Sequence, residues 1–292
     1  MKIVKLKGGL GNQMFQYSYA KLLSSLTNEE VKLDFSSYKS NNGDAVRVPR
    51  IAEFAITLKE CSQDDLKSVN FFNHIGVYSS LKYKAGIWLE SKLNSKYYLA
   101  PREYIDPNKT LKYSYFDGYW QNVGYIEPIK QELFSEFLPK KTLSDNTMKM
   151  IRTVEKQESV FVGVRKGDYT AEKNHYGSFE SDYYKAAMEY ISERVKNPVF
   201  YIFSNDVEWC KRNIDWGRFE VIYREPEQQT SDFEELILMT HFKHAIIINS
   251  TYHWWGAYLI RNKEKIVCCP EKWFFDHCHI DIYPECWVKI MN

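Results

Sequence analysis

An apolar run in the second half of the chain leads directly into charged side chains. Residues 160–164 are typical of a buried strand, and they are followed by Arg165, Lys166, Gly167 and Asp168. Polar groups at the carboxyl end of a parallel strand are where open α/β sheets bind ligands. The planar guanidinium of Arg165 is better suited than a lysine to clamp a phosphate, because it can bond two oxygens at once. The alternative is a charged loop that contacts solvent alone.

Three further polar turns stand where a strand passes into a helix or loop. Residues 8–13 form a glycine-rich turn after an N-terminal strand, residues 204–206 follow an apolar run, and residues 249–251 precede a helix. The N–H groups at a helix start attract anions, so these turns suit a nucleotide or a sugar nucleotide. For the glycine turn, the alternative is a tight turn that needs a flexible backbone. The candidate binding residues are Gly9, Gly11, Asn12, Gln13, Lys166, Ser204, Asn205, Asn249, Ser250 and Thr251.

These turns belong to a pattern of alternating strands and helices. In the second half we expect strands at residues 160–164, 199–204, 220–223, 245–249 and 265–269, separated by helices at residues 181–195, 207–212, 232–242 and 250–260. Apolar strands that alternate with helices predict a parallel sheet covered on both faces, as in a Rossmann-like domain. The first half begins in the same way, with a strand at 3–6, a helix at 12–25 and a strand at 31–35. Residues 138–146 are polar and predict a boundary between domains 1–142 and 143–292.

Composition excludes several classes of protein. The 292 residues include 39 Lys and Arg against 38 Asp and Glu, so the basic surplus of a general nucleic-acid binder is missing. The apolar runs fall far short of the roughly 20 residues that span a bilayer. Because the N-terminus lacks the pattern of a signal peptide, the six cysteines predict free thiols in a cytoplasmic protein. The sequence has no Asp-x-Asp, and its C-terminal Cys and His residues lack zinc-site spacing, so we expect no metal or cofactor.

Taken together, the motifs resemble glycosyltransferase family 11, the bacterial α-1,2-fucosyltransferases. The similar segments occur in the family's order at residues 8–17, 118–121, 165–168, 249–258 and 270–274. The resemblance implies an α/β fold of GT-B type, in which two Rossmann-like domains face each other across a cleft. It also implies that the N-terminal domain receives the acceptor and the C-terminal domain binds the GDP-sugar donor. The implied reaction is inverting, metal-independent transfer of L-fucose from GDP-fucose to the 2-hydroxyl of a galactoside.

The resemblance also assigns roles to individual residues. Arg165 matches the first arginine of the family segment His-x-Arg-Arg-x-Asp, which implies contact with the diphosphate. Ser250 and Thr251 match a hydroxyl cluster, and residues 12–13 match a loop that closes over the donor sugar. The chain departs from this segment at Gly163, where the family has the histidine that helps to hold guanine, and at Lys166, where it has a second arginine. Glu235 stands where the family commonly has an aspartate that shares the guanine contact.

Several alternatives remain open at this point. The general base is either Asp168 or Glu172, ranked equally, with His175 as a third choice. The departures at Gly163 and Lys166 favour, as a second hypothesis, a transferase for another GDP-sugar. A third hypothesis is a sugar-nucleotide or glycan-binding protein without turnover. The family setting implies O-antigen or other surface-polysaccharide synthesis in the cytoplasm. A lipid-linked acceptor at the inner membrane face would then bring peripheral membrane contact.

Overall fold

The chain forms two compact units. The computed structural model describes residues 1–38, 49–69, 86, 88, 91–165, 181–274 and 280–291. Unit 1 comprises Met1–Lys140 with Ile280–Ile282, and unit 2 comprises Lys141–His279 with Tyr283–Asn292. Four residues of the predicted site lie outside the described residues, namely Lys166, Asp168, Glu172 and His175.

Unit 1 is built on a parallel sheet with the strand order β3-β2-β1-β5-β4. Its strands are β1 (Lys2–Lys5), β2 (Val31–Asp34), β3 (Lys59–Glu60), β4 (Tyr97–Leu99) and β5 (Tyr115–Asp117). Its α-helices are α1 (Leu10–Leu26), α2 (Gln63–Val69) and α4 (Lys130–Glu136). Short 3-10 helices lie at Ser36–Tyr38, Arg50–Glu53, Pro107–Thr110, Val123–Tyr125 and Glu127–Ile129.

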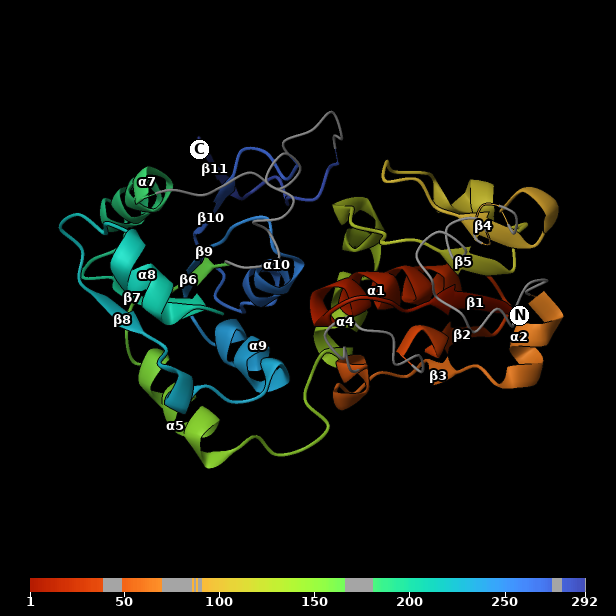
Figure 1. Ribbon diagram of the computed structural model, residues 1–292, viewed down its shortest axis with the longest axis horizontal. Helices are drawn as coiled ribbons and strands as arrows, with labels where there is room; N and C mark the ends of the chain where they lie inside the picture. Colours follow the sequence, from red (N-terminus) through yellow and green to blue (C-terminus); the bar gives the residue numbers. More distant parts are fainter. Residues whose placement is uncertain are drawn as a thin grey trace. The chain divides into compact units, whose positions relative to one another are not determined.

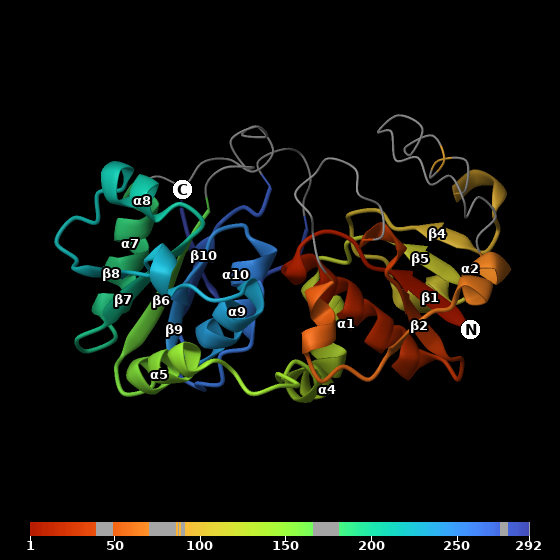
Figure 2. The same cartoon turned by 60° about the horizontal axis from the view of Figure 1, so that its bottom comes forward.

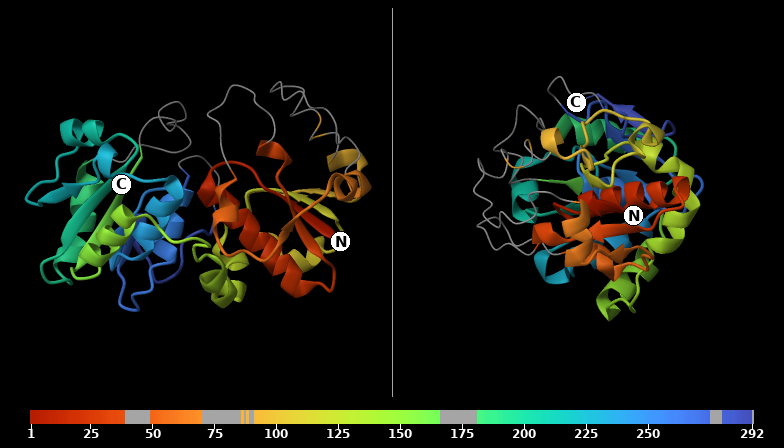
Figure 3. Two further views of the ribbon diagram at one scale, coloured as in Figure 1. Left: turned by 90° about the horizontal axis from the view of Figure 1, so that it is seen from below. Right: turned by 90° about the vertical axis from the view of Figure 1, so that its right-hand side faces the viewer.

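The inner strands β1 and β5 of unit 1 are covered on both faces. Alternation along β5 turns Tyr115 towards α2 and Phe116 towards α1, where it packs against Tyr19. The helix α1 lies along β1 and β2, as Figures 2 and 3 show. Because α1 begins at Leu10, directly after β1 and its glycine turn, the start of this helix lies at the carboxyl edge of the sheet.

Unit 2 is a parallel sheet with the strand order β11-β10-β9-β6-β7-β8. Its strands are β6 (Ser159–Val164), β7 (Val199–Ser204), β8 (Val221–Tyr223), β9 (His244–Ile246), β10 (Val267–Pro270) and β11 (Val288–Ile290). Its helices are α5 (Asp145–Val154), α7 (Ser181–Ser192), α8 (Val207–Asn213), α9 (Asp232–Thr240) and α10 (Thr251–Tyr258), with a 3-10 helix at Pro226–Gln228.

Alternation along β6 divides the core of unit 2 into two layers. Val160, Val162 and Val164 pack against α7 and α8, whereas Phe161 packs against Phe242 after α9 and lies near Gly256 of α10. Figure 1 shows α7 and α8 on one face of the sheet and α9 and α10 on the other. The prediction of two Rossmann-like domains is therefore confirmed, each with its own parallel sheet and helices.

Some predicted elements differ from the observed ones. The strand at 199–204 has the predicted bounds, but the strand predicted at 245–249 ends at Ile246, because the chain turns there towards the start of α10. The strands β3, β4, β5 and β11 were not predicted from the sequence. Each of these strands has only two or three residues, which is too short for a clear hydrophobic period.

Candidate functional site

The topology of unit 2 brings three of the predicted turns to one edge of the sheet. The chain runs from β6 to β7 and β8 on one side, and then returns to place β9 on the other side of β6. Val164 pairs with Ser204 of β7, and Val162 pairs with Ile246 of β9. Arg165 therefore lies between the turns that follow β7 and β9. In open α/β sheets, a reversal of strand order of this kind marks the ligand-binding crevice.

The turn after β9 presents the start of a helix at this edge. Ser250 is the N-cap of α10, but its side chain makes no capping hydrogen bond, and the first turn of α10 carries no acidic residue. Asn249 is buried, and its Nδ2 donates to the carbonyl oxygen of Trp273 over 3.0 Å. Thr251, half-buried, opens the helix. A helix start without a side-chain cap or nearby carboxylate favours an anion.

The charge of Arg165 acts on two side chains of α10. Burial raises the pKa of the Tyr252 hydroxyl well above its usual value, Glu235 and Asp232 raise it further, and Arg165 opposes this shift. Burial lowers the pKa of His253 to about 3, and the charge of Arg165 adds to that effect. Arg165 thus lies near the first turn of α10, and the histidine beside it is neutral at physiological pH.

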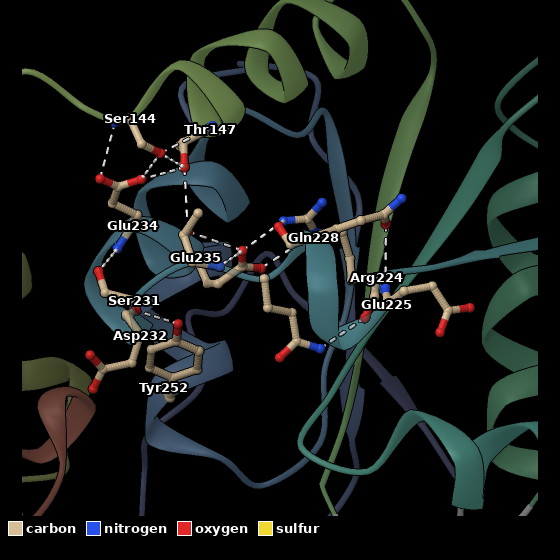
Figure 4. A network of polar contacts seen from close by, with 12 residues as sticks. Ser144, Thr147, Arg224, Glu225, Gln228, Ser231, Asp232, Glu234, Glu235 and Tyr252 are labelled. Carbon is tan, nitrogen blue, oxygen red and sulfur yellow. Dashed lines mark hydrogen bonds and ion pairs between the residues drawn. The ribbon is translucent and has the colours of Figure 1, made fainter.

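Glu235 is held by a buried arginine that was not predicted from the sequence as a site residue. Arg224, directly after β8, donates from Nη2 to Glu235 Oε1 over 2.6 Å, and the side chains are only 6% and 10% exposed. The backbone N–H of Thr230 donates to the same oxygen over 3.1 Å. Figure 4 shows the pair within a wider polar network that includes Ser144 and Glu234. The carboxylate is therefore already engaged, and the predicted guanine contact of Glu235 stays a prediction.

The turn after β7 is organised by its own side chains. Ser204 Oγ accepts a hydrogen bond from the backbone N–H of Asp206 over 3.0 Å. Asp206 in turn caps α8, since its Oδ1 accepts from the backbone N–H of Trp209. Ser204 is buried, whereas Asn205 is exposed at the tip of the turn. Of the two predicted residues, Asn205 is thus the one placed to meet a ligand, and Ser204 shapes the turn.

The glycine turn of unit 1 is braced from several sides. Gly8 has φ +83°, a left-handed conformation that favours glycine, and its carbonyl oxygen accepts from Tyr38 Oη over 2.9 Å. Gln13 is buried, donates to the same oxygen from Nε2 and accepts from the backbone N–H of Ile51. Gln13 therefore holds the turn in place. A Cβ on Gly9 would meet nothing within 4 Å, which leaves open space beside the start of α1.

Neighbouring side chains make this edge of unit 1 suitable for a sugar. Asn12 Oδ1 accepts from Gln121 Nε2 over 2.9 Å. The ring of Tyr119 is 45% exposed, and the Lys7 ammonium lies 4.7 Å from its centroid. Carbohydrates are bound by aromatic faces together with amide groups and charged groups of this kind. Residues 118–121 follow β5 directly, and no separate role was predicted for them from the sequence.

A buried ion cluster supports the same edge. Asp117 closes β5 and is fully buried, with Lys5 Nζ at 3.2 Å and Lys7 Nζ at 2.5 Å. Burial opposes ionisation of Asp117, but the two ammonium groups outweigh it and hold the pKa well below its usual value. The cluster ties the ends of β1 and β5 together. It thereby fixes the positions of Lys7 and Tyr119.

The described residues have two further properties. Within them, no helix is both long enough and apolar enough to cross a bilayer. Cys61, Cys210, Cys268, Cys269 and Cys286 are free thiols, as the sequence predicts.

Comparisons with known proteins agree on one family. The family model "Glycosyl transferase family 11" matches residues 67–291. An α-1,2-colitosyltransferase of Escherichia coli is 32% identical, over 99% of the chain and 98% of its own length. The O-antigen biosynthesis glycosyltransferase WbnK of Escherichia coli is 27% identical, over 98% of the chain and 99% of its own length. Galactoside α-(1,2)-fucosyltransferase 1 of Ateles belzebuth is 30% identical, over 59% of the chain and 48% of its own length.

Proposed function

Because the chain belongs to glycosyl transferase family 11, we propose that it transfers L-fucose from GDP-fucose to the 2-hydroxyl of a galactoside. The family predicted from the sequence is confirmed, and with it the prediction of a glycosyltransferase. The identity of the donor sugar, the identity of the acceptor and the inversion at the anomeric carbon are what we propose. Relatives named for α-1,2-colitosyl and galactoside α-(1,2)-fucosyl transfer support the linkage and the acceptor.

One observation carries the donor site: Arg165 directly follows β6, an inner strand of unit 2, and lies beside the uncapped start of α10. Transfer of a sugar from its nucleoside diphosphate leaves negative charge on the departing diphosphate. A guanidinium and oriented backbone N–H groups stabilise such charge where it develops. We propose that these groups do so without a divalent cation. The exposed Asn205 lies on the neighbouring turn, where it would contact the same donor.

The acceptor is assigned to unit 1. The exposed ring of Tyr119 and the paired amides of Asn12 and Gln121 lie at the carboxyl edge of its sheet, where the turn after β1 meets the turn after β5. An aromatic face packs against the C–H face of a sugar, and amides hydrogen-bond its hydroxyls. The adjacent Lys7–Asp117 ion pair anchors the Lys7 ammonium to the end of β5.

The general base is proposed from the sequence alone. Asp168 and Glu172 stay the two candidates, with His175 third, for taking the proton of the acceptor hydroxyl as the new bond forms. Attack by that hydroxyl opposite to the departing diphosphate inverts the anomeric carbon. Separate Asp168→Asn and Glu172→Gln variants distinguish the candidates, because only loss of the base lowers kcat steeply while GDP binding persists.

A colitosyl donor is the second candidate. The relative that is 32% identical over 99% of the chain is named for colitosyl transfer, and the sequence departs from the family segment at Gly163 and Lys166. The test is a donor screen with GDP-fucose and GDP-colitose against a panel of β-galactosides, followed by linkage analysis of the product. An α-1,2-linked fucoside supports the first proposal, and an α-1,2-linked colitoside supports the second. Binding of GDP with no product from either donor would refute both.

A further inference from the structure

The turn that follows β5 in unit 1 contains a residue with a strained backbone. Trp120 has φ 56°, in the left-handed region, and the other non-glycine residue with a positive φ among those described is Asn197. Asparagine adopts this conformation readily, whereas a bulky side chain rarely does. Such a residue persists only where its surroundings impose the conformation, and residues of this kind are concentrated at functional sites. The contacts of Trp120 show what imposes it here.

The bend at Trp120 brings two consecutive side chains onto one helix. Phe116 and Trp120 both pack against Tyr19 of α1, as alternation along an extended chain predicts for residues an even number of positions apart. On the same pattern Gln121 would point away from α1, yet its Nε2 donates to Asn12 Oδ1 over 2.9 Å. Asn12 and Tyr19 lie seven residues apart, about two helical turns, and so share one face of α1. The left-handed backbone thus permits both contacts.

Aromatic packing holds the indole of Trp120 in place. Its ring centroid lies 3.5 Å from that of Tyr19, and the two planes are parallel within 4°. Tyr125 meets the indole edge to face, with the ring centroids 5.8 Å apart. The side chain is 5% exposed, and its Nε1 has no hydrogen-bond partner among the described residues. A phenylalanine at this position would therefore keep a ring against Tyr19 without losing a hydrogen bond.

Gly118 leaves the room that this indole occupies. A Cβ built on Gly118 would lie 2.5 Å from the Cβ of Ala100 and 3.0 Å from Cε2 of Trp120. The first distance is closer than such atoms approach, and Ala100 is fixed directly after β4, where its backbone N–H donates to the carbonyl oxygen of Asp117. The turn is therefore confined by Ala100 on one side and by α1 on the other.

The same bend leaves the ring of Tyr119 exposed. Tyr119 lies between Gly118 and Trp120, yet its ring is 45% exposed, with the Lys7 ammonium 4.7 Å from the centroid. Trp120 thus lies buried between two side chains, Tyr119 and Gln121, that are presented at the carboxyl edge of the sheet. A residue so placed acts on a ligand through its neighbours.

We propose that Trp120 is a positioning residue for the acceptor: its indole, anchored on Tyr19, sets the orientation of Tyr119 and Gln121. This inference rests on the proposed function, which assigns the acceptor to this surface. Binding groups that are already ordered lose less freedom when a ligand binds, so loosening the turn weakens the acceptor complex. The proposed donor site belongs to unit 2 and is built from other residues, so its affinity for the GDP-sugar should not change.

The test is initial-rate kinetics of the full chain with a β-galactoside and the GDP-sugar that the donor screen selects. Trp120→Ala removes the indole, whereas Trp120→Phe keeps an aromatic ring against Tyr19. A well-placed aromatic contact is worth up to about tenfold in affinity. We expect Trp120→Ala to raise the KM for the galactoside about tenfold and to leave the KM for the GDP-sugar within about twofold. Trp120→Phe should stay within about threefold of the unmodified chain for both.

Further variants show whether Trp120 acts through Tyr119. Tyr119→Ala removes the proposed sugar contact, so Trp120→Ala added to it should raise the galactoside KM much less than Trp120→Ala does alone. Gly118→Ala displaces the indole without changing position 120 and should also raise this KM. Leu66→Ala is the matched control, because it opens a cavity beneath α2 on the opposite face of the same sheet. It should lower the melting temperature and leave both KM values unchanged.

The outcomes separate positioning from a merely structural role. An unchanged galactoside KM in a folded Trp120→Ala variant overturns the inference, and so does an equal rise in the KM for both substrates. An equal rise in the galactoside KM of Leu66→Ala, or fully additive effects of Trp120→Ala and Tyr119→Ala, overturns it as well. Where Trp120→Ala does not fold, Trp120→Leu keeps apolar volume without a ring and is judged in the same way. Absence of transfer by the unmodified chain refutes the proposed function itself, which distinguishes the two failures.

Discussion

Protonation of His253 gives a stability prediction that needs no ligand. The folded-state pKa of about 3 lies below the usual histidine value of about 6.5. Between pH 6.5 and pH 3, His253 is therefore protonated in the unfolded chain but neutral in the folded chain. The free energy of unfolding falls as the pH falls below 6.5, and it levels off only below the folded-state pKa. Between pH 7 and pH 5 this one group should remove about 2 kcal/mol of the free energy of unfolding.

The assay is urea unfolding of the unmodified chain and of His253→Phe at pH 7 and pH 5. Other groups also titrate in this interval, so the informative quantity is the difference between the two proteins. The variant should lose about 2 kcal/mol less than the unmodified chain when the pH is lowered. The control is His241→Phe, which removes a partly exposed histidine from the end of α9 and so shows the effect of replacing an imidazole outside the core. If His253→Phe loses as much stability as the unmodified chain, His253 is not a buried neutral histidine.

Two further predictions concern stability. Glu235→Ala leaves the guanidinium of Arg224 buried without its partner and should cost about 3–5 kcal/mol, whereas the double variant Glu235→Leu with Arg224→Met should cost much less. Equal losses from urea unfolding of the two proteins would contradict the buried-pair argument. Gly8→Ala places a Cβ in a left-handed conformation and 2.8 Å from Asn12 Nδ2, so it should cost about 1–2 kcal/mol, while Gly9→Ala should be close to neutral. Equal melting temperatures for these two variants would show that the turn is not constrained at Gly8.

The sequence predicted which residues lie at the carboxyl edge of the sheet in unit 2, but it did not predict the contacts between side chains of different elements there. Arg165, Ser204 and Asn249 each follow an apolar run, and the parallel sheet brings such run ends together. The direct contact between Gly163 and His253 could not be predicted in this way. It joins residues far apart in the sequence, and it depends on how α10 packs against β6.

Glu235 illustrates a second limit. The family resemblance implied that its carboxylate contacts guanine, yet Arg224 approaches this carboxylate from the end of β8. Nothing in the local pattern around Arg224 indicates a buried cation, because a single arginine after a three-residue strand is typical of an exposed turn. In unit 1, likewise, β5 is held by its pairing with β1 and β4 and by the Asp117 ion cluster. Its three residues are too few to show a hydrophobic period, so the strand could not be predicted from the local sequence.

The central claim is that Arg165 stabilises the charge of the departing diphosphate, and the rate of donor turnover by Arg165→Ala tests it most directly. With a chelator present throughout, the unmodified chain should stay active and Arg165→Ala should lose at least about 100-fold in kcat, the scale of removing one preorganised electrostatic contact. Arg165→Lys should recover part of the loss, because it keeps the charge without the bidentate geometry. Arg218→Ala, which removes an exposed arginine paired with Glu189, should match the unmodified chain. Activity that disappears with the chelator and returns with a divalent cation, or an Arg165→Ala variant with undiminished kcat, would contradict the account.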